Sequence, residues 1–98
     1  MQHISTDPAR IKKLKFRAWR RGFREADLIL GPFADELLTT LPADEIDAFE
    51  VLLEQPDQDL YAWIIERDPT PPEFDTPVMA RIKAFRFGAR QTRTDLGA

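Results

Sequence analysis

The sequence predicts an all-α protein, a compact antiparallel bundle of about five short helices. Three observations lead to this prediction. Apolar residues recur at the helical spacings of three and four along most of the chain. No segment alternates polar and apolar residues for long enough to indicate a strand. Prolines and glycines separate the periodic segments, so each helix is short and its connections are tight.

The first helix is expected at about residues 8 to 21. Asp7 can accept hydrogen bonds from free backbone amides, and Pro8 loses no hydrogen bond in a first helical turn. Gly22 follows, and a glycine often ends a helix in the left-handed conformation. The apolar stripe of this helix consists of Ile11, Leu14 and Ala18. Another side carries the aromatic residues Phe16, Trp19 and Phe23.

A second helix begins at about Arg24, and Gly31-Pro32 is expected to kink or restart it. Proline lacks the amide donor and crowds the preceding turn. Pro42 opens a third helix, whose first turns are acidic. Its apolar positions are Ile46, Phe49, Leu52 and Leu53.

Asp57 is expected to cap a short fourth helix that carries Leu60, Trp63 and Ile64. The prolines between residues 69 and 77 predict an extended connection, and a last helix then runs from Pro77 to about Gly88.

Length and composition indicate one small domain at residues 1–88 with a flexible tail at 89–98. The chain has no cysteine, which excludes a disulfide framework. No apolar run approaches the roughly 18 residues that cross a bilayer, and the first residues lack the order of a secretory signal. We therefore expect a cytoplasmic bacterial protein with no membrane insertion.

Charge is strongly segregated along the chain. Residues 1–25 carry eight Lys or Arg against two acids, whereas residues 26–76 carry one Arg against fourteen acids. Such blocks build opposed electrostatic faces, and the acids repel phosphate from much of the molecule. A protein partner of mixed charge fits this pattern better than a nucleic acid.

Little in the sequence indicates catalysis. The single histidine, His3, lies near the terminus, so a catalytic triad is not supported. Clustered His and Cys ligands for a metal are missing, and so is a glycine-rich phosphate loop. We expect no enzyme activity, no metal site and no stably bound cofactor.

The connection between the first two helices carries a family resemblance. Arg20, Arg21, Gly22 and Glu25 match an Arg-Gly-x-x-Glu signature preceded by a second arginine. Supporting matches are Asp27, Pro32-Phe33 and the segment from Asp57 to Trp63. Over about residues 10–88 the chain resembles the SdhE family, the small FAD assembly factors of succinate dehydrogenase. Phe23 stands where methionine is common in the family.

The resemblance implies a protein that binds the flavoprotein subunit of succinate dehydrogenase, and of fumarate reductase. It would promote the covalent bond between the flavin 8α-methyl carbon and a histidine of that client. FAD would then belong to the client. An antitoxin-like or other protein-interaction module, and less so a nucleic-acid binder, are the alternatives.

The predicted partner-binding residues are Arg20, Arg21, Gly22, Phe23, Glu25 and Asp27. Gly22 lacks a Cβ, so a partner backbone can approach closely. Arg21 can make a forked contact with a client carboxylate or carbonyl, and Glu25 can pair with client cations or orient Arg21. Phe23 can either pack against the second helix or anchor a partner. The alternative for Arg21 and Glu25 is a mutual surface pair.

Overall fold

The computed structural model describes residues 7–86 and confirms the all-α prediction. Within this range the chain forms α-helices and two short 3-10 turns, and no strand. The helices are α1 (Pro8–Trp19), α2 (Arg24–Leu37), α3 (Ala43–Leu53), α4 (Asp57–Ile64) and a last helix at residues 77–86. The 3-10 turns are η2 (Leu38–Thr40) and η3 (Pro72–Phe74). The predicted tail at 89–98 lies outside the described residues.

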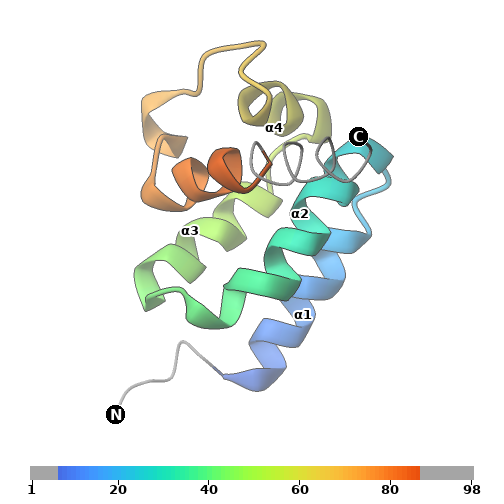
Figure 1. Cartoon of the computed structure of the whole chain (residues 1–98), viewed down its shortest axis with the longest axis vertical. Coiled ribbons are helices and arrows are strands. Elements are labelled where there is room, and N and C mark those ends of the chain that lie inside the picture. Colours follow the sequence, from blue (N-terminus) through green and yellow to red (C-terminus); the bar gives the residue numbers. More distant parts are fainter. Residues whose placement is uncertain (1–6, 87–98) are drawn as a thin grey trace, which may run out of the picture.

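The helices are arranged so that two connections meet at one end of the bundle. Helices α1 and α2 run antiparallel, side by side, and α3 lies on the other side of α2 in the view of Figure 1. Helix α4 lies at the end where α1 turns into α2. The α1–α2 turn and the α3–α4 turn are therefore neighbours, although about thirty residues separate them in the sequence.

One hydrophobic core joins all the helices. Its largest side chains, among them Phe33 and Phe49, have no exposed surface, and their rings lie 5.6 Å apart. Burying one such side chain contributes about 1.5–3 kcal/mol. The core residues that the sequence predicted for α1 and α3 are all buried: Ile11, Leu14, Ala18, Ile46, Phe49, Leu52 and Leu53.

The start of α1 is as predicted, but its end is earlier. Asp7 accepts a hydrogen bond from the Ala9 N–H at 3.1 Å, as an N-cap should. The helix ends at Trp19 rather than Arg21, because Arg20 leaves helical geometry and its N–H bonds back to the Arg17 carbonyl. Gly22 has the expected left-handed backbone, with φ +88°.

A kink or a restart was predicted at Gly31-Pro32, and the restart is wrong, because α2 continues through Pro32. Proline removes one backbone hydrogen bond and strains the preceding turn. Leu30 and Phe33, on either side, are fully buried, so packing holds both halves of the helix in place.

The predicted cap at Asp57 is also wrong. The N-cap of α4 is Pro56, which offers no side-chain hydrogen bond, and Asp57 is the first helical residue. The carboxylate of Asp57 instead pairs with Arg21. The proline-rich connection at 69–77 is not extended throughout, since it contains η3.

An ion pair between the exposed Arg81 and the buried Glu45 attaches the last helix to α3. Arg81 donates to both carboxylate oxygens of Glu45, at 2.5 and 3.1 Å, and Glu45 is 8% exposed. These hydrogen bonds from Arg81 lower the pKa of Glu45 below its usual value. The sequence suggested only that Glu45 loads the start of α3 with acid.

Candidate partner-binding site

Arg21 is the anchor of the α1–α2 turn. Its Nη1 donates to the Leu53 carbonyl at 2.6 Å and its Nη2 to the Gln55 carbonyl at 2.5 Å. Its Nε lies 2.8 Å from Oδ1 of Asp57. The Arg21 side chain is only 6% exposed. The forked contact expected with a partner is thus made inside the chain, where it satisfies carbonyls at the end of α3.

Asp27 closes the same turn from the α2 side. Its Oδ1 accepts a hydrogen bond from the backbone N–H of Arg21 at 3.0 Å. The carboxylate lies in the first turn of α2, where the helix dipole also favours a negative charge. Asp27 therefore fixes the position of the arginine that holds the turn.

Phe23 packs against the neighbouring helix and keeps part of its surface accessible. Its ring meets that of Tyr61 on α4 edge to face, with centroids 5.2 Å apart and planes at 71°. The side chain is half-buried at the edge of the core. Packing against the second helix and anchoring a partner were the two roles predicted for Phe23. The ring contact that the structure shows is with α4, and the anchoring role stays a prediction.

Three of the six predicted residues are exposed, namely Arg20, Gly22 and Glu25. No heavy atom lies within 4 Å of the position that a Cβ on Gly22 would take. No ion pair joins Glu25 to Arg21 in the described part of the chain, so the mutual surface pair is absent there. We call these three the exposed residues, and we call Arg21, Phe23 and Asp27 the framework residues.

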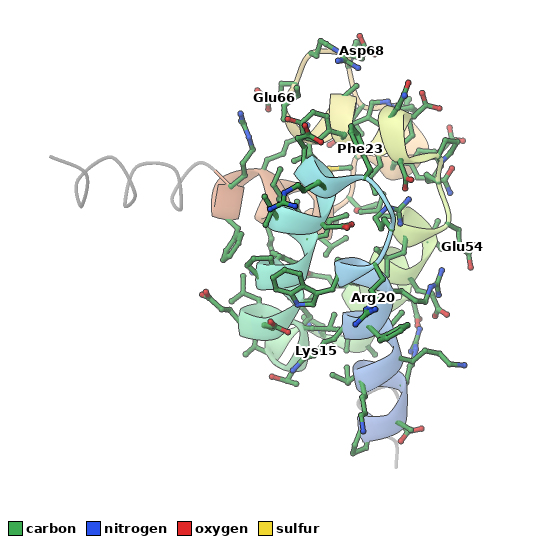
Figure 2. All side chains as sticks on the ribbon, turned by 90° about the vertical axis from the view of Figure 1, so that its right-hand side faces the viewer. Lys15, Arg20, Phe23, Glu54, Glu66 and Asp68 are labelled. Atoms are coloured by element: carbon green, nitrogen blue, oxygen red, sulfur yellow. The ribbon has the colours of Figure 1, made fainter. Side chains whose placement is uncertain are left out.

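The framework residues hold the exposed residues on a fixed backbone. Arg21 reaches α3, Phe23 reaches α4, and Asp27 belongs to α2, so three helices determine where the turn lies. Figure 2 shows Phe23 between Arg20, lower on the molecule, and Glu66 and Asp68 at its upper end.

A close contact between α1 and α2 supports the turn from below. The Trp19 ring covers Gly31, and a Cβ at Gly31 would lie less than 3.0 Å from three ring atoms. Trp19 Nε1 also donates to Oδ2 of Asp35 at 3.0 Å. Sequence reasoning missed this contact because it treated Gly31 only as part of a helix break. A lone glycine in an apolar helical run was the available signal.

One side of the turn borders a hollow of about 410 Å³. Its lining comes from the α1–α2 turn and the beginning of α4: Gly22, Phe23, Pro56, Asp57, Gln58 and Asp59. The open space beside Gly22 is therefore continuous with an acidic helix start. A partner that contacts Gly22 would also meet α4.

Two kinds of site are not found in the part of the chain that the structure describes. Residues 7–86 contain no group of three or more His, Cys, Asp or Glu side chains arranged to hold a metal ion. The same residues include no helix that is both long and apolar enough to span a membrane.

Comparison with known proteins identifies the family. Residues 12–86 match the Sdh5 family model, whose description is "Flavinator of succinate dehydrogenase". The chain belongs to this family. The match begins inside α1 and ends at residue 86, in the last helix, so it includes the Gly22 turn and every framework contact. The resemblance to SdhE proteins is confirmed.

Individual proteins are also similar to this chain. The FAD assembly factor SdhE of Acetobacter pasteurianus is 40% identical over 74 residues, which cover 76% of this chain and 68% of that protein. The mitochondrial succinate dehydrogenase assembly factor 2 of Dictyostelium discoideum is 36% identical over 72 residues, or 74% and 51% of the two chains. The assembly factor 2-A of Drosophila ananassae is 36% identical over 76 residues, or 76% and 49%.

The chain thus spans about half the length of these two mitochondrial relatives. No solved structure matches the chain.

Proposed function

We propose that this protein binds the flavoprotein subunit of succinate dehydrogenase and promotes the covalent attachment of its FAD. The family match over residues 12–86 carries the proposal. The names of the bacterial and mitochondrial relatives, an FAD assembly factor and a succinate dehydrogenase assembly factor, agree with it. The flavoprotein of fumarate reductase is proposed as a second client, and the cytoplasm of a bacterium as the location.

The proposed contact surface is centred on the exposed residues. Gly22 presents bare backbone to open space, with the cationic Arg20 before it and the anionic Glu25 after it. Because the framework residues are already fixed by internal contacts, little conformational entropy is lost when a partner binds. The main contribution of the framework residues Arg21, Phe23 and Asp27 is accordingly to hold this surface in place for the partner.

The protein would act by positioning, as an assembly factor rather than an enzyme. We propose that it restrains a mobile part of the client so that the reacting histidine stays next to the flavin carbon. Holding two reacting groups in a productive geometry can itself supply several kcal/mol of a barrier. The reacting groups belong to the client and its cofactor, and FAD is not bound stably by this chain.

The test of this proposal is covalent flavin fluorescence of the succinate dehydrogenase flavoprotein in cells that lack the gene. We expect the fluorescence to fall in the deletion strain and to return with the wild-type gene. Unchanged covalent flavin in the deletion strain would contradict the proposed function.

A Gly22→Asn variant tests the contact surface. Asparagine tolerates positive φ better than most residues, so the fold should be retained, while its side chain fills the space beside the turn. We expect the melting temperature to change by a few degrees at most and binding to the purified flavoprotein to weaken ~10-fold or more. Glu66→Asn is the matched control, since Glu66 also has positive φ but lies at the end of α4. If Gly22→Asn binds the flavoprotein as tightly as Glu66→Asn does, the Gly22 turn does not contact the flavoprotein.

A further inference from the structure

An exposed aromatic residue on α1 is not accounted for by the fold or by the Gly22 turn. Phe16 is 60% exposed, the largest exposed fraction among the large hydrophobic side chains of the described residues. The guanidinium carbon of Arg20, one helical turn later, lies 4.8 Å from the centre of the Phe16 ring. This cation–π contact holds the guanidinium in place at the surface.

Phe16 and Arg20 form one edge of a second hollow, of about 260 Å³. It lies between the last turns of α1 and the α3–α4 turn, and it shares Asp57 with the hollow beside Gly22. Its lining residues are Phe16, Arg17, Arg20, Arg21, Leu53 and Asp57. We call it the arginine hollow. It combines an apolar wall with three guanidinium groups.

The acids near the arginine hollow balance its positive charge only in part. Arg17 lies 3.7 Å from Glu50, but the same Glu50 carboxylate is 2.7 Å from Arg10. Arg21 is close to Asp57, yet its buried Nε has no aligned hydrogen-bond acceptor. Arg20 has no acidic partner among residues 7–86. Three guanidinium groups against two carboxylates leave one positive charge.

The geometry points to a carboxylate docking site. We propose that the arginine hollow takes an Asp or Glu side chain of the partner protein, with an adjoining apolar group packed on Phe16 and Leu53. One excess positive charge matches one carboxylate and falls short of a doubly charged phosphate. This inference rests on the proposed function and adds a second contact to the Gly22 turn, with Arg20 shared between the two.

A nucleic acid fits the arginine hollow less well. Binding to a phosphate backbone draws on several cations at once, because affinity comes from the phosphates neutralised together. The fourteen acids at residues 26–76 and a net charge of −3 oppose it. A partner that supplies a single acid beside an apolar side chain meets no such opposition.

The test is binding of the full chain to the purified succinate dehydrogenase flavoprotein, measured by calorimetry at several salt concentrations. Phe16→Ala and Arg20→Gln should each weaken binding about 10-fold, and Arg20→Glu should weaken it further, since each removes a central contact. Arg20→Gln should also make the affinity less dependent on salt. Arg20→Lys, which keeps the charge but loses the planar fork, should fall between wild type and Arg20→Gln.

Lys15→Gln is the matched control, because it removes one positive charge from α1 at a residue that does not line the arginine hollow. Lys15 and Arg20 are both labelled in Figure 2. Lys15→Gln should bind within about twofold of wild type. Circular dichroism should give all variants the same helical content, since Phe16 and Arg20 are exposed.

The outcomes separate this inference from the proposed function. Wild-type binding that Phe16→Ala and Arg20→Glu leave unchanged would overturn the arginine hollow and leave the function intact. If Lys15→Gln weakens binding as much as Arg20→Gln does, the loss comes from the general positive charge of this region. That result would also overturn the arginine hollow as a docking site. If the wild type fails to bind the flavoprotein, both proposals fail. If the wild type binds DNA with an affinity that Arg20→Gln abolishes, the arginine hollow is a nucleic-acid site and this inference is overturned.

Discussion

Among residues 7–86, two turns contain a residue with left-handed backbone, and the two turns differ in the type of that residue. After α1 the residue is Gly22, with φ +88°; after α4 it is Glu66, with φ 63°. The Glu66 turn is a Schellman motif, in which the Arg67 N–H bonds to the Ala62 carbonyl and the Glu66 N–H to the Trp63 carbonyl. Positive φ therefore does not by itself exclude a side chain in this fold. At Gly22 the absence of a side chain also leaves the space beside the turn open.

The largest expected effect comes from removing the anchor of the Gly22 turn. Arg21→Ala deletes two hydrogen bonds to carbonyls and the ion pair with Asp57, at a site that is 6% exposed. We expect the free energy of unfolding to fall by about 3 kcal/mol in urea denaturation. Arg24→Ala, an exposed neighbour, should change it by less than about 0.5 kcal/mol. Similar effects of the two variants would mean that Arg21 does not hold the turn.

Gly31→Ala should have the next largest effect, because it disturbs the α1–α2 contact that supports the Gly22 turn. The added Cβ would overlap the Trp19 ring and force it outward. Overpacking lowers the free energy of unfolding by about 1–3 kcal/mol. The better helix propensity of alanine offsets up to about 1 kcal/mol of this loss. Thermal denaturation should show the loss, and the emission of Trp19 should shift to longer wavelength. Unchanged emission with full stability would show that the ring has room to adjust.

Glu66→Gly should stabilise the protein, because glycine adopts positive φ without steric cost. The expected gain is about 1 kcal/mol in the free energy of unfolding. The pair between Glu66 and Lys83, at 3.8 Å with Glu66 well exposed, contributes little against it. Flavoprotein binding should not change. A loss of stability would indicate that the Glu66 side chain makes a stronger contact than the structure shows.

The smallest expected effect is on the pH dependence of stability. The hydrogen bonds from Arg81 lower the pKa of Glu45. The contribution of Glu45 to the free energy of unfolding is therefore fully present above the unfolded-state pKa of about 4.5. It is lost as the pH falls through the lower folded-state pKa. Wild type should therefore be more stable than Glu45→Gln at neutral pH, and the difference should narrow below about pH 4.5 in pH-dependent denaturation. A difference that does not narrow below about pH 4.5 would contradict this role of the hydrogen bonds from Arg81.

The fold class and the helix order could be predicted from the sequence, because they follow from local patterns. Asp7 and Pro8 start α1, and Gly22 takes the left-handed conformation that a helix end calls for. The restart at Pro32 was wrong, because buried neighbours on both sides outweigh one lost backbone hydrogen bond. That outcome depends on packing between helices, which a window along the chain does not contain.

The site was predicted less completely, because its internal contacts are long-range. Arg21 donates hydrogen bonds to carbonyls 32 and 34 residues away. Asp57, which was expected to cap α4, pairs with Arg21 instead. No spacing rule reveals such partners. The resemblance located the turn, and the structure then divided its residues into framework and exposed residues. Binding by the exposed residues stays a prediction.

The acceptors of the Arg21 side chain have a consequence for how this protein can diverge. Leu53 and Gln55 offer main-chain oxygens, which every amino acid possesses. Replacement of either side chain would leave the arginine its acceptors, whereas insertion or deletion of a single residue between α3 and α4 would move them out of reach. Loop length at that junction should thus be far more constrained than amino-acid identity.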